Sequence, residues 1–155
     1  MFIDAQTQLW NATALTIDAV STNAYDLGAD AVASATRRDP AIGEPLVIVL
    51  TVGVAAKVSG TTETYEFQVI QADDSALTTN VEILAKYPFT NTQAAALLKA
   101  GAIIVMPIPP GSVTRRYLGA QFDGSNTPTI TVSAYITLQS MVQMTRSYAT
   151  LIQVL

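Results

Sequence analysis

The chain has 155 residues, of which 50% are hydrophobic and 13% are charged, and its formal net charge is −4. It contains no histidine and no cysteine, which excludes disulfides and removes the commonest acid–base groups, nucleophiles and metal ligands. No stripe of lysines and arginines could follow a run of phosphates, so we expect no nucleic acid as a partner. Because the usual metal-ligating and catalytic side chains are missing, we also expect no metal or cofactor.

The apolar composition instead indicates an assembly. A soluble protein with so few charges has too little polar surface to cover itself, and we expect other protein surfaces to cover part of it. Residues 46–56 form the most apolar run, but they are too short to span a bilayer. The first residues lack the basic segment of a signal peptide, and we therefore expect synthesis in the cytoplasm and no membrane association.

Segments with alternating apolar and polar residues recur along the chain, separated by turn residues, as in antiparallel β proteins. Residues 46–57 are a nearly continuous β-branched run, typical of a strand buried on both faces. Residues 29–44 are predicted to form a loop. The predicted strands and extended pieces are residues 13–20, 25–28, 46–57, 63–73, 80–87, 103–108, 113–122 and 129–138.

Two connections have distinct signals. Thr90-Asn91-Thr92 is predicted to cap one short helix over residues 93–100, and Gly101 follows that helix in a position that favours left-handed geometry. Asp123-Gly124-Ser125-Asn126 predicts a hairpin turn between the last two strands. Together these elements predict one all-β domain over residues 1–139, a jelly-roll-type antiparallel sandwich of about eight strands with one short helix.

Residues 140–155 are predicted to form an extended C-terminal tail, because a chain end rich in apolar residues needs a surface on which to dock. One alternative is a final edge strand on its own domain, and the other is an arm that adds to a neighbouring subunit by strand pairing. The apolar tail residues that we expect at a contact are Met141, Met144, Tyr148, Leu151, Ile152, Val154 and Leu155.

No set of residues forms a recognisable catalytic motif, and we predict that the protein is not an enzyme. Asp73-Asp74 is the only adjacent acidic pair and is expected to form a solvated turn, while 123–126 offers too few oxygens for calcium. Successive strand residues face opposite ways, so one of Arg115 and Arg116 is expected to point toward a core or an interface, where it would need a carboxylate or carbonyl partner.

Three further positions are candidates for contacts. Trp10, the only tryptophan, could stack on a sugar, anchor the edge of the core, or lie in an interface. Arg37 and Arg38 lie in a polar loop, where they could bind acidic groups of a partner or be solvated. Phe2 and Ile3 complete the predicted interface set at the start of the chain.

Several short motifs occur in a characteristic order over about residues 2–139. They are Phe2-Ile3-Asp4-Ala5-Gln6, Val20-Ser21-Thr22-Asn23, Tyr25-Asp26-Leu27-Gly28, Ile42-Gly43-Glu44-Pro45-Leu46, Met106-Pro107-Ile108-Pro109-Pro110-Gly111, Arg116-Tyr117-Leu118 and Ala134-Tyr135-Ile136-Thr137-Leu138. In this order they resemble the Bbp16-like capsid cement, or decoration, proteins of tailed bacteriophages.

The resemblance implies a jelly-roll protein on the outer face of an icosahedral head whose shell has the HK97-type fold. Its partners would be the major capsid protein, where capsomers meet, and further copies of itself in a homo-dimer or homo-trimer. It implies a location in the virion and no catalytic or cofactor residues. The alternative function is a lectin-like or receptor-binding sandwich module of the virion, which rests on Trp10 and the tyrosines.

Overall fold

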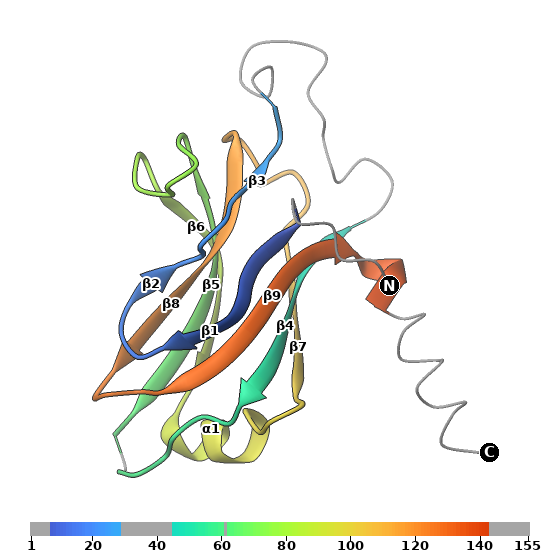
Figure 1. The fold of residues 1–155 in the computed structure, drawn as a ribbon. Coiled ribbons are helices and arrows are strands. Elements are labelled where there is room, and N and C mark those ends of the chain that lie inside the picture. The colour runs from blue at the N-terminus through green and yellow to red at the C-terminus, as the bar shows by residue number, and fades with distance from the viewer. Residues whose placement is uncertain (1–6, 29–44, 61, 143–155) are drawn as a thin grey trace, which may run out of the picture.

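The computed structural model describes residues 7–28, 45–60 and 62–142, and these form two antiparallel sheets packed face to face (Figure 1). Sheet A has the strand order β1-β9-β4-β7, and sheet B has the order β2-β8-β5-β6, with β3 also paired to β8. The strands of sheet A are β1 (Gln8–Leu15), β9 (Ile130–Leu138), β4 (Leu46–Val54) and β7 (Ile103–Pro107). Those of sheet B are β2 (Ala19–Val20), β3 (Tyr25–Asp26), β8 (Tyr117–Ser125), β5 (Thr64–Ala72) and β6 (Glu82–Phe89).

The order of the strands is that of a jelly roll. β2 and β3 both pair with the same edge of β8, and together they act as one interrupted strand. The nine strands of the described residues therefore fill eight positions, four in each sheet. Successive strands alternate between the sheets except at the β5–β6 connection, which gives two interleaved Greek keys. The predicted fold class, all-β and of jelly-roll type, is confirmed.

The core lies between the sheets and combines aromatic residues of sheet B with aliphatic residues of sheet A. Phe122 on β8 lies 5.4 Å from Phe67 and 6.1 Å from Tyr65, between ring centroids. Sheet A contributes fully buried side chains such as Ile48 and Leu50 from β4. Val47 and Val49, on the opposite face of β4, are 0% and 2% exposed, which confirms the predicted burial on both faces for the first half of this strand. Its second half is open on the outer face, where Val54 is 58% exposed.

The predicted hairpin at Asp123-Gly124-Ser125-Asn126 is wrong. β8 continues to Ser125 and pairs with β5, whereas β9 pairs with β1 and β4, so the connection crosses from one sheet to the other. Asn126 and Thr127 make the turn with φ of 62° and 60°. The reason is that the apolar faces of β8 and β9 pack against each other across the core, which edge-to-edge pairing would prevent.

The predicted strand over residues 13–20 is also divided between sheets. β1 belongs to sheet A and pairs with β9, and β2 belongs to sheet B and pairs with β8. The chain changes sheets at residues 16–18, where Ile17 is 69% exposed although the alternating pattern puts it on the same face as Leu15, which is 2% exposed. The alternating pattern continues through residues 16–18, and for that reason the sequence alone predicted a single strand across the crossover.

The predicted helix begins earlier than expected. Helix α1 (Asn91–Leu97) is preceded by Thr90, whose side chain accepts the N–H of Gln93 while the Gln93 side chain accepts the N–H of Thr90. This reciprocal capping box confirms the predicted cap and fixes the helix start. Gly101 has φ of +82°, as predicted for the residue that redirects the chain into β7. The described helices include none long and apolar enough to cross a membrane.

The β5–β6 loop folds back over the outer face of sheet B. Leu77, with φ of +57°, is 1% exposed and packs with Ile70 and Ala72 in a small second core. Asp74 holds the loop by accepting the N–H groups of Thr78 and Thr79 at 2.9 and 2.7 Å. These bonds keep the pKa of Asp74 below its usual value, the Thr79 N–H having the largest effect.

Gly119 on β8 makes room for this loop. A Cβ at this position would overlap the Leu77 side chain and lie 2.9 Å from Ser21 Oγ. Replacing Gly119 by alanine should therefore displace the loop and lower the free energy of unfolding by about 1 to 3 kcal/mol. Denaturant unfolding measures the change. Gly53→Ala on β4 is the matched control, because its Cβ would lie at an ordinary 3.6 Å from Thr131 O; an equal loss in both variants would contradict the explanation.

Candidate contact surfaces

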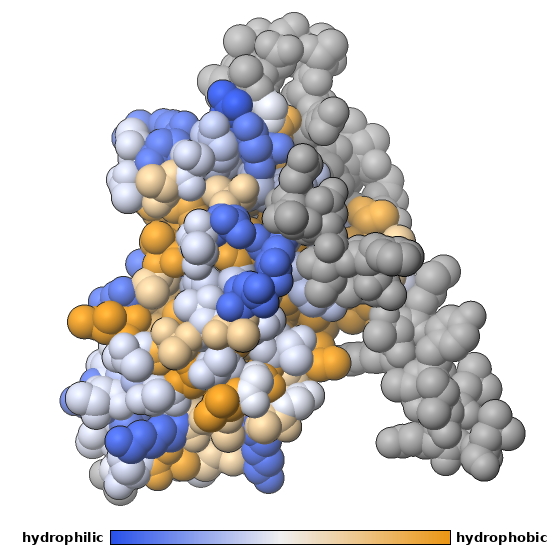
Figure 2. Space-filling model, viewed as in Figure 1, coloured by the Kyte–Doolittle hydropathy of each residue, from blue (hydrophilic) through white to orange (hydrophobic). Residues whose placement is uncertain are grey.

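Charge is distributed unequally between the two sheets. The four strands of sheet A contain no charged residue. The strands of sheet B contain Asp26, Glu66, Glu82, Lys86 and Asp123. On the surface in view in Figure 2, apolar residues lie between polar ones without forming one continuous patch. The two outer faces of the sandwich therefore offer different chemistry to a partner.

The outer face of sheet A is uncharged and partly apolar. Its residues alternate with those that enter the core. Val47 and Val49 on this face are buried, and we give the name uncharged face to the partly or fully exposed residues of β4, β7 and β9 around them: Thr51, Val54, Ile103, Val105, Thr131, Ser133, Tyr135 and Thr137. Val54 and Ile103 are 58% and 50% exposed, and both lie at the end of the sheet near α1. Partial burial raises the pKa of Tyr135. The uncharged face can contact another surface with little cost of desolvating charge.

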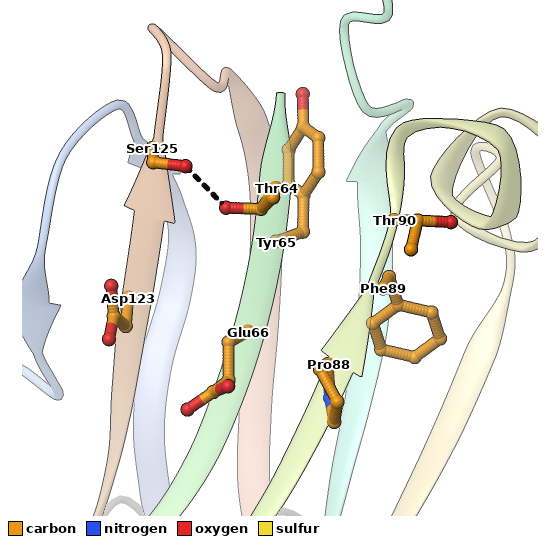
Figure 3. A pocket seen from close by; sticks show the side chains of 8 residues that line it. All are labelled: Thr64, Tyr65, Glu66, Pro88, Phe89, Thr90, Asp123 and Ser125. Atoms are coloured by element: carbon orange, nitrogen blue, oxygen red, sulfur yellow. Dashed lines mark hydrogen bonds between the residues drawn. The ribbon is translucent and has the colours of Figure 1, made fainter. Parts of the chain in front are cut away.

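The outer face of sheet B contains an open hollow of about 290 Å³ beside the end of β6 (Figure 3). Its lining comes from three neighbouring strands and the start of α1: Thr64, Tyr65, Glu66, Pro88, Phe89, Thr90, Asp123 and Ser125. Glu66 and Asp123 lie directly opposite each other on β5 and β8. Two residues along each strand, Thr64 and Ser125 form the next pair on this face, and their hydroxyl oxygens are 2.6 Å apart.

The two carboxylates of the hollow are held differently. Glu66 Oε1 lies 3.1 Å from Lys86 Nζ and accepts a hydrogen bond from Gln68 Nε2 at 2.5 Å. The pKa of Asp123 is raised, first by partial burial and then by the negative charges of Asp18 and Glu66. The carboxylates are neighbours on the flat surface of a sheet and do not face each other across a cleft. The described residues contain no cluster of acidic residues suited to hold a metal ion.

At the end of the sandwich away from α1, polar residues fasten the β7–β8 loop to sheet B. Gln71 is 0% exposed, and its Oε1 accepts the N–H groups of Thr114 and Arg115 at 2.8 and 3.1 Å. Its Nε2 donates to Glu82 Oε2 at 2.8 Å. A neutral buried side chain thus accepts hydrogen bonds from two backbone N–H groups of a loop that does not pair with a strand at these residues.

Both arginines at the start of β8 pair with carboxylates. Arg115 Nη1 lies 2.9 Å from Asp73, and Arg116 donates two hydrogen bonds to Asp26 at 2.8 and 2.7 Å. The Arg116 bond lowers the pKa of Asp26. Their side chains remain 30% and 36% exposed, so the alternative that one of them enters the core is wrong, although the expected carboxylate partner is present for both. The reason is that both precede β8 and do not alternate as strand residues do.

Few of the predicted contact residues fall in the described part of the chain. Trp10 is 1% exposed, packs in the core and directs its Nε1 toward Val20 O at 3.4 Å, so a surface role for it is wrong and the core alternative is confirmed. Met141 is 47% exposed. It lies in residues 139–142, which are helical, whereas one alternative for the tail was an edge strand. The remaining predicted residues lie outside the described residues: Phe2, Ile3, Arg37, Arg38, Met144, Tyr148, Leu151, Ile152, Val154 and Leu155.

The described residues next to these segments lie together at one end of sheet A. Ile136 N–H donates to Thr7 O, and Gln139 N–H donates to Pro45 O, both at 2.9 Å. Thr7 and Pro45 therefore lie on either side of the end of β9, close to the point where residues 139–142 leave the sheet. Three predicted contact segments join the domain at this end.

Sequence reasoning missed the Glu66–Asp123 pair and the role of Gln71. Glu66 was expected within a strand and Asp123 within a turn, and only the register of β5 with β8 brings the two together. Gln71 carries no sequence signal, because a glutamine at the end of a strand usually faces solvent.

The fold and these surfaces define a jelly-roll sandwich whose two outer faces differ in charge. A family model for Bbp16 matches residues 9–137, which is most of the chain. The protein belongs to the Bbp16 family, a phage-associated family. No curated protein matches the chain.

Replacing Gln71 by leucine should leave the N–H groups of Thr114 and Arg115 without acceptors. The expected loss is about 1 to 3 kcal/mol in the free energy of unfolding, since both donors are partly buried and a fully buried unsatisfied donor costs about 1 to 3 kcal/mol. Gln68→Leu is the control on the same strand, because Gln68 is equally buried but its Oε1 has no partner. We expect that control to stay within about 1 kcal/mol of the wild type. Equal effects in denaturant unfolding would contradict the assigned role of Gln71.

Proposed function

We propose that the protein is a capsid cement, or decoration, protein that binds the outer surface of an HK97-type head where capsomers meet and stabilises that head. The observation that carries the proposal is membership of the phage-associated Bbp16 family over residues 9–137. The jelly roll supports it as a compact, non-repetitive scaffold for contacts. Its partners are then the major capsid protein and further copies of the chain in a homo-dimer or homo-trimer.

The uncharged face is the surface that we propose for contact with the shell or with neighbouring subunits. Association costs about 4 to 15 kcal/mol in lost freedom, so a small subunit needs contact area that is cheap to desolvate. Thr51, Val54 and Ile103 provide such area without a charge to bury. Repetition over the many equivalent sites of a head multiplies weak individual contacts.

The lectin-like alternative loses its main support. It rested on Trp10 and the tyrosines, and the Trp10 side chain lies in the core. We likewise propose no catalytic role. Glu66 is already engaged by Lys86 and Gln68, and the hollow beside it is open to solvent on the sheet surface.

The proposal predicts that the purified protein binds to expanded heads that lack it. Co-sedimentation should reach a saturating ratio, and the bound heads should rupture at a higher temperature than bare heads. Ile103→Glu should weaken binding at least tenfold, because it places a charge in the uncharged face.

The matched control is Ile83→Glu on sheet B, where the wild-type side chain is 43% exposed against 50% for Ile103. This variant should bind like the wild type. Binding lost equally in both variants would count against the uncharged face as the contact. No saturable binding of the wild type to any bare head would contradict the cement function itself.

A further inference from the structure

Three carboxylates form a row across neighbouring strands of sheet B. The register pairs Ala19 with Phe122 on β2 and β8, so that Asp18, one residue before β2, lies beside Asp123. On the other side of β8, Asp123 is directly opposite Glu66 on β5. Like charges directly opposite each other in a sheet destabilise it, and here one residue has such a neighbour on both sides.

The row has one positive neighbour, which pairs with Glu66. Lys86 on β6 lies 3.1 Å from Glu66 Oε1, at the end of the row away from Asp18. Among the described residues the charged groups facing Asp123 are Asp18, Glu66 and Lys86. With all of them ionised the group would carry three negative charges and one positive charge.

Asp18 also fastens the crossover between the sheets. Its Oδ1 accepts the N–H of Gly124 on β8 at 3.0 Å, and this bond closes residues 16–18 onto sheet B. A proton on Asp123 allows that side chain to donate a hydrogen bond to Asp18, and the side-chain bond to Asp18 is one of the causes that raise the pKa of Asp123. A second carboxylate charge beside Asp18 would repel it from this position.

We propose that a proton on Asp123 joins its carboxyl group to Asp18 and so latches the β1–β2 crossover onto β8, firmly while the proton is bound and loosely once it is lost. The latch goes beyond the proposed function and does not depend on it. It is a conformational device of the sandwich that acts at the edge of sheet B where β2 pairs with β8.

The sign of the pH dependence follows from proton linkage. Folding raises the pKa of Asp123 above its usual 3.8, so the folded protein binds the proton more tightly than the unfolded chain. This proton therefore stabilises the fold when the pH falls toward 3.8, and the stabilisation is lost as the pH rises through the value in the folded state. Partial burial is the largest cause of the raised pKa, and the charge of Asp18 is the second.

Asp123→Asn tests the latch, because its amide can donate to Asp18 at every pH. At pH 7 the variant should melt about 2 to 4 °C above the wild type, and the difference should shrink toward zero near pH 4. The Gly124 amide should exchange with solvent severalfold more slowly in the variant than in the wild type at pH 7. A melting difference that is constant from pH 4 to pH 7 would overturn the proposal.

Asp74→Asn is the control for simple removal of a negative charge. Hydrogen bonds from the Thr78–Thr79 backbone hold the pKa of Asp74 low, so its amide variant should melt below the wild type at pH 7. A rise in both variants would assign the effect to net charge and contradict the latch. Asp18→Asn should lower the pKa of Asp123 measured by carbon NMR of its carboxyl group; an unchanged pKa would also overturn the proposal.

Discussion

Burial of one face of each sheet against the other is the constraint on which the rest of this structure depends. The aromatic side chains of Phe67 and Phe122 need the aliphatic surface of sheet A opposite them, and neither sheet could bury its apolar face alone. With β2 and β3 taken as one interrupted strand, consecutive strands therefore join opposite sheets at every connection except β5–β6. The break at residues 16–18 and the crossover turn at Asn126-Thr127 both follow from this requirement.

Alternation of apolar and polar residues predicted most strands and the fold class, and the capping residues Thr90-Asn91-Thr92 predicted the start of a helix. It could not predict pairing, because a turn signal such as Asp123-Gly124 is compatible with a hairpin in one sheet or a crossover between two. The same limit hid the candidate surfaces. Asp18, Asp123 and Glu66 are far apart in sequence and meet only through the registers of β2 and β5 with β8.

The unequal distribution of charge gives the apolar composition a structural meaning. Every charged strand residue of the described chain belongs to sheet B, where several of them pair across strands or fasten loops. The strands of sheet A carry no charge on either face, so a partner can cover the outer surface without burying an unpaired charged side chain. In a Bbp16-family protein this asymmetry supports the proposal that one side of the sandwich serves contact and the other faces solvent.

Cryo-electron microscopy of the phage head that carries this chain is the most direct test of the cement function. The account predicts jelly-roll density on the outer surface where capsomers meet, with the strands of sheet A turned toward the shell or a sister subunit and the hollow beside Asp123 toward solvent. Heads with no such density on their outer surface, in particles shown by mass spectrometry to contain the protein, would contradict it.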